Sequence, residues 1–260
     1  MMSKVVLRSD DIESLKNLLA LCPDTFSSIP VKFVKANGES FISIEAIDIN
    51  GDIVFSGKVT VNDLTDIEDN TGLIIRLPLN KALINNVLNS NFEELTITKN
   101  KISAISPNKK LSISLLMINE NDVFEFPYTS EELYELAVTE NNVKESKFVV
   151  FDPDFKQLKE LVDIVSVLSE FETLEFKEKN GMLIITGSDT VGNEFQYTFN
   201  TTIESGFTSK YDTNLIKILN KVLKSKDKDS VSMLVSDLLV GVTLRDDKSV
   251  ITLAVTARRD

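Results

Sequence analysis

The chain of 260 residues has no histidine, no tryptophan and a single cysteine, and these gaps exclude several kinds of chemistry. Without imidazole there is no Ser-His-Asp triad and no zinc site of the common histidine-containing types. The one thiol, Cys22, cannot form a disulfide within the chain, and its neighbours Leu21 and Pro23 favour a structural role. Scarce cysteine also fits a reducing compartment. We therefore expect no catalytic residue, no metal and no cofactor.

Long apolar runs are also missing. No stretch approaches the roughly 18 to 20 apolar residues of a membrane helix, and the first residues contain no apolar signal core. These gaps predict a soluble intracellular protein with no membrane partner.

Acidic side chains outnumber basic ones by 40 to 28, which gives a net charge of −12 at pH 7. Taken as a whole, that charge argues against DNA, because it repels other polyanions over about a Debye length.

Alternating apolar residues and Asn-Gly pairs indicate antiparallel hairpins. Apolar side chains recur with period two in stretches such as 31–34 and 41–44. Turns are predicted at Asn37-Gly38, Asn50-Gly51 and Asn180-Gly181, because both residues of each pair tolerate a positive φ. The stretch 48–52 lacks the glycine spacing and the final Glu of a calcium loop, so we do not expect it to bind calcium.

Four segments have helical spacing instead. They are 9–22, capped by Ser9 or Asp10; 80–91; a segment from Asp152-Pro153 to about 168; and a segment from Asp212 to about 226. In the fourth segment the residues expected to point inward are Leu215, Ile218, Leu219 and Val222.

The order of the predicted elements repeats. Residues 4–118 give a strand, a helix, several hairpin strands, a strand, a second helix and three strands, and residues 146–257 give the same order. Two halves of similar length with one element order imply a duplicated domain. We predict an α+β protein with an N-terminal domain 1–118, an acidic connector 119–147 and a C-terminal domain 148–260.

The connector carries eight acidic residues against Lys144 and Lys147, which is typical of an exposed segment. Within it lies an apolar cluster from Val123 to Tyr128 that includes Phe124 and Phe126. Two interpretations remain open for this cluster: it fixes the connector to the sheet beneath it, or it forms the edge of a groove that binds peptides.

Positive charge is concentrated on the predicted helices. Residues 212–226 sum to +3, whereas 9–22 sum to −2. At about 100° per residue, Lys217, Lys221 and Lys224 lie on one face with no acidic residue. The second segment has Lys81 on a face without acid, the third mixes Lys156 and Lys159 with acids, and the first has only Lys16.

These lysines allow two interpretations. A solvated helix face is the ordinary one, but such a face usually interleaves Glu with Lys. Contact with phosphates explains the absence of acid, and it would be independent of DNA sequence, since no Arg or Asn is suitably placed to contact base edges. A weak basic patch on an acidic protein is a poor open binding surface. It makes sense if topology, rather than affinity, keeps the DNA in place.

Several runs in the second half resemble sliding clamps of the proliferating cell nuclear antigen type, the ring-shaped processivity factors of DNA polymerases. The run 151–159 resembles the strand into that family's third helix, and 208–217 resembles the strand into the fourth. The runs 230–233, 237–240 and 253–254 resemble the closing strands. The total length, the acidity and the acidic connector agree with this resemblance.

The resemblance implies a homotrimeric ring, with antiparallel sheets outside and two helices per domain facing a channel for duplex DNA. Ring closure would join the edge strands at 109–117 and 194–202. A partner groove under the connector would bind peptides of a polymerase, a clamp loader and other replication proteins. The residues implied for DNA are Lys217, Lys221, Lys224, Lys81, Lys156, Lys159 and Lys16. Those implied for the groove are Phe124, Phe126, Leu238, Leu253, Ala254 and Val255.

Two departures from the family pattern are visible. Ala254-Val255-Thr256 stands where the family usually has Ala-Pro-Lys, and the first helix has less lysine than is typical. Such divergence suits a viral or bacteriophage clamp, working at replicating DNA in a prokaryotic cytoplasm, a nucleus or a viral replication site.

Three hypotheses follow. The first is a non-enzymatic sliding clamp, with a monomeric or heteromeric processivity factor of the same fold as its nearest variant. The second is an acidic protein-interaction module that never binds DNA. The third is an enzyme that uses a carboxylate pair such as Asp189 and Glu194 around Gly192, although this stretch is better explained as a hairpin turn.

Overall fold

The computed structural model describes residues 4–26, 28–48, 50–62, 64, 67, 71–78, 92–106, 109–114, 148–167, 171–189, 191–200, 207–223, 230–236 and 239–258. The chain forms two compact units. The first consists of 1–46 and 55–127, and the second of 47–54 and 128–260. The division between 127 and 128 falls in the predicted connector, which lies outside the described residues. The predicted helix at 80–91 lies outside them too.

The first unit contains a four-stranded antiparallel sheet with the order β1-β6-β7-β8. Its strands are β1 (Lys4–Arg8), β6 (Glu94–Thr98), β7 (Lys101–Ser106) and β8 (Lys109–Ser114). Buried side chains alternate along the central strands: Leu95 and Ile97 of β6 are 1% and 0% exposed, as period two predicts. Strand β8 is an edge of this sheet.

Four longer strands of the first unit follow one another in the order β5-β2-β3-β4. They are β2 (Ser28–Ala36), β3 (Glu39–Ile47), β4 (Ile53–Val61) and β5 (Thr71–Pro78). Asn37 and Gly38 join β2 to β3 with φ of 54° and 79°, which confirms the predicted Asn-Gly hairpin turn. Three of these strands each contribute a fully buried side chain to the core: Phe33 of β2, Ile42 of β3 and Phe55 of β4.

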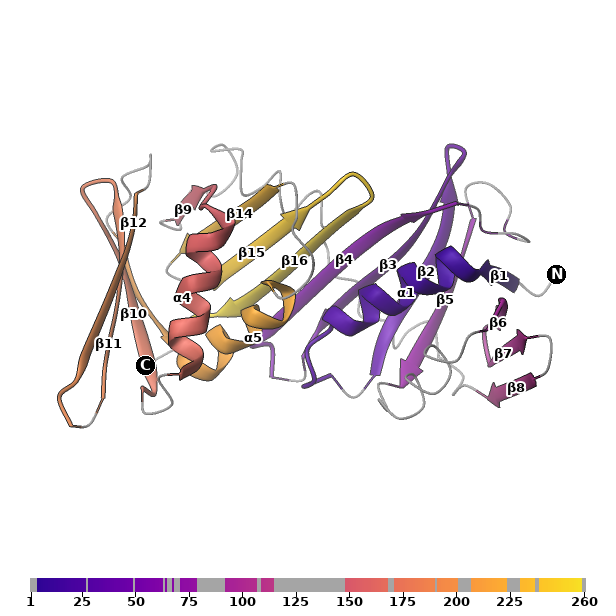
Figure 1. Cartoon of the computed structure of the whole chain (residues 1–260), viewed down its shortest axis with the longest axis horizontal. Coiled ribbons are helices and arrows are strands. Elements are labelled where there is room, and N and C mark those ends of the chain that lie inside the picture. The colour runs from indigo at the N-terminus through magenta and orange to yellow at the C-terminus, as the bar shows by residue number, and fades with distance from the viewer. Residues whose placement is uncertain are drawn as a thin grey trace. The chain divides into compact units, whose positions relative to one another are not determined.

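Helix α1 (Ser9–Leu21) follows β1 directly (Figure 1). Its buried face comprises Ile12, Leu15, Leu18 and Leu19, as predicted. The predicted cap at Ser9 or Asp10 is wrong, because Arg8 is the N-cap and makes no side-chain capping bond. A Cβ on Gly57 of β4 would lie 2.5 Å from the Leu18 Cδ1 atom, so glycine allows α1 to pack closely at this point.

The second unit contains a four-stranded antiparallel sheet with the order β12-β11-β10-β13. Its strands are β10 (Thr173–Lys179), β11 (Met182–Ser188), β12 (Glu194–Asn200) and β13 (Thr208–Asp212). The predicted turn between β10 and β11 is confirmed by φ of 55° at Asn180 and 72° at Gly181. The Glu178 carboxylate also accepts a hydrogen bond from the Gly181 amide at 3.0 Å.

Four further strands of the second unit follow the order β16-β15-β14-β9. They are β9 (Phe148–Phe151), β14 (Ser230–Ser236), β15 (Leu239–Arg245) and β16 (Ser249–Thr256). One face of these strands is fully buried at Val235, Val240, Val242, Leu244 and Leu253. The tip of the β3–β4 hairpin belongs to this unit, where the Thr256 amide donates to the Asp52 carbonyl at 2.9 Å.

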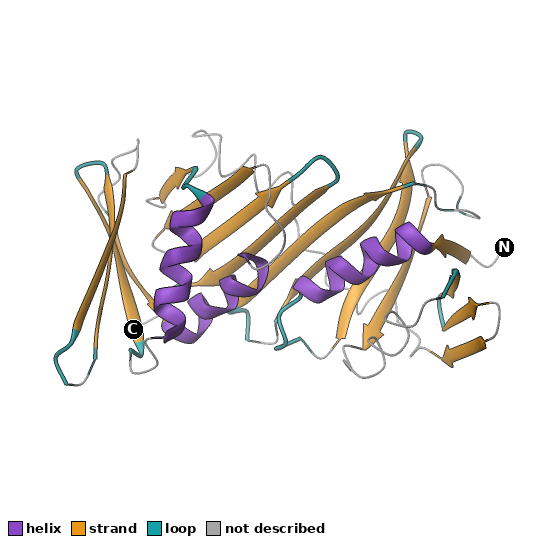
Figure 2. Ribbon diagram, in the orientation of Figure 1, coloured by secondary structure: helices purple, strands orange, loops and turns teal. Residues whose placement is uncertain are grey.

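Two helices, α4 (Phe155–Val167) and α5 (Thr213–Leu223), lie over these strands and pack on each other (Figure 2). Helix α5 also packs on β16. The Asp154 side chain accepts the Lys156 amide at 2.7 Å and so caps α4, which begins two residues later than the Asp152-Pro153 pair predicted. In the described part of the chain no helix is long and apolar enough to cross a membrane.

Candidate nucleic-acid interface

Helix α5 presents two of the three predicted lysines. Ile216, Leu219, Val222 and Leu223 form its buried face, each no more than 1% exposed. Lys217 and Lys221 lie outside that face and are half-buried, while Lys224 lies outside the described residues. Ile218 was predicted to point inward, but it is only partly buried, because the inward face is centred on Leu219 and Leu223.

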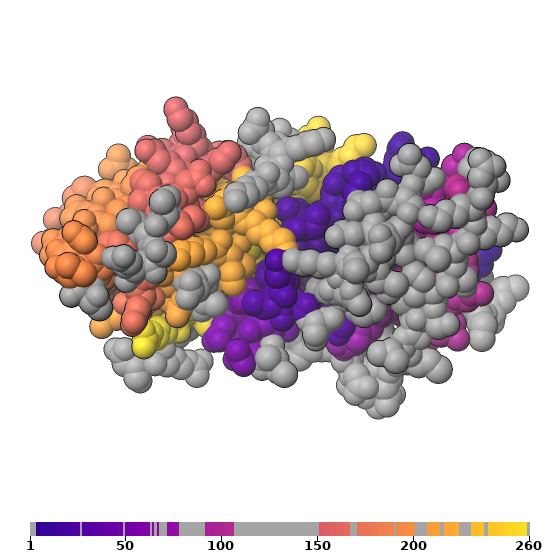
Figure 3. All heavy atoms as spheres, turned by 60° about the horizontal axis from the view of Figure 1, so that its bottom comes forward, coloured from indigo at the N-terminus to yellow at the C-terminus, as the bar shows by residue number. Residues whose placement is uncertain are grey.

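Helix α4 adds Lys156 and Lys159, both fully exposed. Glu160 and Asp163 are exposed on the same helix, so its solvent surface is locally balanced in charge. The inward face of α4 is Leu158, Leu161, Val162 and Val165. Atoms of this part of the second unit, salmon to orange in Figure 3, reach the molecular surface. The basic character of the helix pair therefore comes chiefly from α5.

A hydrogen-bonded chain joins the two helices. The Asn220 side-chain amide of α5 donates to the Ser166 hydroxyl of α4 at 3.2 Å, and that hydroxyl donates to the Val162 carbonyl at 2.7 Å. Asn220 is only 8% exposed. The structure thus brings Lys156 and Lys159 together with Lys217 and Lys221 in one helix pair of the second unit.

Helix α1 differs from this pair. Its solvent-exposed residues include Asp10, Glu13, Asn17 and Ala20. Lys16, which was predicted to contact DNA, forms an ion pair with Glu13 at 3.1 Å between Nζ and Oε2. The charge of Lys16 is therefore offset within α1, so α1 offers no net positive face. The remaining predicted lysine, Lys81, lies outside the described residues.

The predicted groove residues divide between two faces of β16. Leu253 and Val255 are 0% exposed and lie on the face that α5 covers. Ala254 alternates to the opposite face, beside Gly241 of β15 in the strand register. A Cβ on Gly241 would lie 3.3 Å from the Ala254 Cβ, so a larger residue than glycine at position 241 would crowd Ala254. Phe124, Phe126 and Leu238 lie outside the described residues.

Hydroxyl groups flank Ala254 on its face of the sheet. Ser232, Thr243 and Thr252 are neighbours in the register of β14, β15 and β16, and each is 6–9% exposed. The Thr243 and Thr252 hydroxyls are 2.9 Å apart and share a hydrogen bond. Sequence reasoning missed this polar row, although the alternation of Thr252, Leu253 and Ala254 was a usable signal.

The two strands predicted to close a ring are both sheet edges. Strand β8 ends the order β1-β6-β7-β8, and β12 ends the order β12-β11-β10-β13. On β12, Phe195 and Tyr197 are only half-buried. The Tyr197 hydroxyl donates to the Gln157 carbonyl at 3.2 Å, and burial together with nearby Glu160 raises its pKa. A strand with no described neighbour on one side and with half-exposed aromatic rings is suited to a partner strand.

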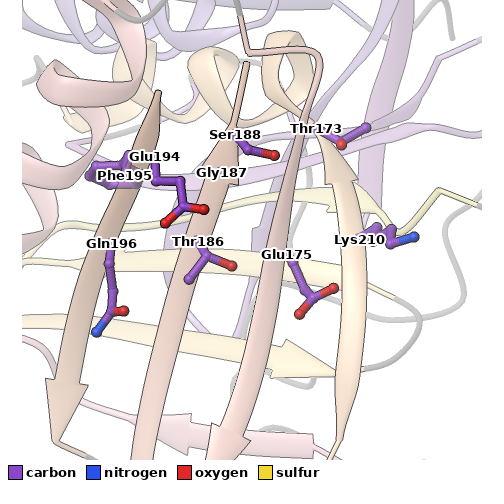
Figure 4. A pocket seen from close by; sticks show the side chains of 9 residues that line it. All are labelled: Thr173, Glu175, Thr186, Gly187, Ser188, Glu194, Phe195, Gln196 and Lys210. Atoms are coloured by element: carbon purple, nitrogen blue, oxygen red, sulfur yellow. The ribbon is translucent and has the colours of Figure 1, made fainter. Parts of the chain in front are cut away.

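A shallow hollow of 710 Å³ lies on the outward face of β10, β11, β12 and β13 (Figure 4). Its lining includes Glu175, Glu194 and Lys210 together with hydroxyl and amide side chains of neighbouring strands. Sequence reasoning did not single out this hollow. The described residues hold no group of three or more metal-ligating side chains.

Asp189, the residue of the enzymatic hypothesis, is part of a hairpin loop. Its carboxylate accepts the backbone amides of Val191 and Asn193 at 2.9 and 2.8 Å and the Asn193 side-chain amide at 2.6 Å. The side-chain bond from Asn193 lowers the pKa of Asp189 below its usual value. A carboxylate held ionised by its own loop is a poor proton donor, so the geometry favours the hairpin explanation.

The comparisons with known proteins concern the fold. No protein-family model and no curated protein matches the chain. Proliferating cellular nuclear antigen (PCNA) from Entamoeba histolytica matches with a TM-score of 0.67 at 12% identity, over 100% of both chains. The PCNA2-PCNA3 complex from Sulfolobus tokodaii matches with a TM-score of 0.66 at 11% identity, over 98% of this chain and 99% of that one. A. fulgidus PCNA, solved with the C-terminal region of FEN-1 bound, matches with a TM-score of 0.66 at 11% identity, over 100% of this chain and 99% of that one. The chain therefore has the PCNA-type sliding-clamp fold along its whole length.

Proposed function

We propose that this protein is a DNA sliding clamp, a non-enzymatic processivity factor that encircles duplex DNA and tethers a polymerase. The observation that carries the proposal is the match in fold over the full length of both chains, 100% of each for the Entamoeba histolytica protein. A match of that extent includes both units and their helices, rather than a single shared motif.

The proposed DNA contact is made by the helices of the second unit. Lys217 and Lys221 of α5, with Lys156 and Lys159 of α4, supply ammonium groups for phosphate oxygens. Such contacts do not depend on base sequence, and few of them per subunit leave the protein able to slide. The net charge of −12 opposes binding on any open surface, so encirclement rather than affinity would retain the duplex.

We infer that the chain assembles into a homotrimer, and the positions of two strands at sheet edges support this assembly. Strands β8 and β12 are each the last strand of their sheet, one in each unit, so head-to-tail pairing between copies removes both edges and closes a ring. One of the similar structures is itself a complex of PCNA2 with PCNA3, which supports association of chains of this fold.

Peptides of polymerase and clamp-loader subunits are the proposed partners on the face that carries Ala254. The similar A. fulgidus PCNA binds the C-terminal region of FEN-1, which supports a peptide partner for this fold. The proposed place of work is replicating DNA. Leu253 and Val255 are fully buried on the other face, and Ala254, which is 8% exposed, is the described residue that lies on the face of the proposed groove.

Sedimentation at micromolar concentration tests the assembly. The expected mass is three times that of the 29.0 kDa chain. Monomers alone would contradict the ring. Monomers that nevertheless support processive synthesis would identify a monomeric processivity factor, while a protein that neither trimerises nor binds duplex DNA at low salt would identify an acidic protein-interaction module.

A further inference from the structure

Asn220 is a polar residue in a place where helices usually pack apolar side chains. It lies on α5 against α4 and is 8% exposed, in a helix whose other buried residues are mostly aliphatic. Its amide nitrogen donates to Ser166, but its Oδ1 atom has no hydrogen-bond partner among the described residues. An unpaired buried oxygen destabilises a fold, so an apolar side chain of similar size would make this helix contact more stable.

We propose that Asn220 is a positioning residue that fixes how α5 lies against α4, and so sets the spacing between the lysines of the two helices. Aliphatic side chains alone permit neighbouring helices to slide or rotate, whereas one directional hydrogen bond selects a single arrangement. The bond between Asn220 and Ser166 is such a constraint. Its function in DNA contact rests on the proposed clamp function.

The geometry connects this bond to the lysines. Lys217 and Lys221 lie three residues before and one residue after Asn220 on α5, while Lys159 lies two turns before Ser166 on α4. Both helices are rigid elements, so a shift at the Asn220–Ser166 contact moves both sets of lysines relative to each other. Phosphates along duplex DNA are regularly spaced. The lysines of both helices can therefore contact phosphates at the same time only for some relative positions of α4 and α5.

A matched control is present on the same helix. Thr213 is 1% exposed, and its Oγ1 atom also has no hydrogen-bond partner among the described residues. Unlike the Asn220 side chain, the Thr213 hydroxyl therefore does not bond to the described part of α4. Asn220→Leu and Thr213→Val both remove a buried oxygen that has no hydrogen-bond partner among the described residues, but only the first removes the bond between the helices.

The test measures the distance between spin labels at Lys159→Cys and Lys217→Cys in the full chain without DNA. Native Cys22 is 2% exposed and does not compete for the label. We expect one narrow distance distribution in the parent and in Thr213→Val, and a shifted or broadened one in Asn220→Leu. Ser166→Ala, an exposed position that tolerates the change, should broaden it as well and serves if Asn220→Leu does not fold.

Duplex DNA binding, measured without labels at several salt concentrations, provides the second readout. The slope of log affinity against log salt should fall by about 0.9 for each phosphate that Asn220→Leu no longer neutralises, and should not change in Thr213→Val. Unchanged label distances, or an unchanged slope despite altered distances, would overturn the positioning function. If the distances change but the parent does not bind DNA at all, the constraint stands and the clamp function fails.

Discussion

Helices α1 and α5 both follow a short strand and both bury an aliphatic face, yet their solvent faces carry opposite charge. Helix α5 presents Lys217 and Lys221, while α1 presents Asp10 and Glu13 and neutralises Lys16 by an ion pair. On the proposed ring both helices would face the duplex. The contrast teaches that DNA contact in the proposed clamp would be uneven: the lysines of α5 would attract the phosphate backbone, and the acids of α1 would repel it.

The two helices also differ in how a buried polar residue anchors them. Asp11 of α1 is 5% exposed, and its carboxylate accepts both the backbone amide and the side-chain amide of Asn62, at 2.9 and 3.4 Å. Asn220 of α5 has one of its polar groups unpaired among the described residues. The Asp11–Asn62 hydrogen bonds of α1 thus stabilise the first unit. The proposed function of the Asn220–Ser166 bond of α5 is instead to define how two helices contact each other, at a cost in folding stability.

Reversing the charge on α5 should give the largest effect. In the proposed trimer, Lys217→Glu/Lys221→Glu would remove six phosphate contacts. Six such contacts contribute roughly a thousandfold gain in affinity when the salt falls from 200 to 50 mM. We expect most of that gain to disappear when duplex binding is measured by fluorescence anisotropy. The control is Lys177→Glu/Lys179→Glu, the same charge change on exposed residues of β10. Equal losses of affinity in both variants would show that net charge matters and that the α5 face does not.

Removing the anchor of α1 should affect stability rather than DNA. Asp11→Ala leaves the Asn62 amide without its acceptor, so the free energy of unfolding should fall by about 1–3 kcal/mol. Urea titration followed by circular dichroism measures the change. Asp10→Ala, at an exposed position one residue earlier, is the matched control and should cost less. A stability loss no greater than that of the control would mean that the Asp11–Asn62 contact does not hold α1.

Neutralising the exposed acids of α1 should give the smallest effect, and in the opposite direction. Asp10→Asn/Glu13→Gln removes repulsion and releases Lys16 from its ion pair, so affinity for duplex DNA should rise a few-fold at low salt. Lys16→Gln alone should change affinity little, because an exposed ion pair already offsets that charge. If the double variant binds no better than the parent, α1 does not face the DNA.

Much of the fold was predictable, because many of its strands and turns are determined by patterns within short stretches of sequence. Period-two alternation and the Asn-Gly pairs predicted the hairpins, and the positive φ of Asn37 and Asn180 confirms two of the turns. The start of α4 was missed because two aspartates flank Pro153, and only the folded backbone determines that Asp154 reaches the Lys156 amide. Ile218, which was predicted to point inward, is only partly buried, because the face that α5 packs against α4 and β16 is centred on neighbouring residues.

The candidate site was less predictable. The lysines of α4 and α5 were visible in the sequence, but the pairing of Lys16 with Glu13 was overlooked, although a separation of three residues on a helix is a local signal. The different faces of Leu253 and Ala254 likewise followed from strand alternation. The bond from Asn220 to Ser166 had no such signal, because Ser166 lies on α4, more than fifty residues earlier in the chain.

Retention on DNA is the most direct test of encirclement. The protein is allowed to thread onto a linear duplex, both ends are then blocked with a bulky protein, and the salt is raised until phosphate contacts are screened. The measured quantity is the lifetime of the complex with blocked ends relative to open ends. Encirclement predicts long retention only when the ends are blocked. Equal, short lifetimes with open and blocked ends would contradict it.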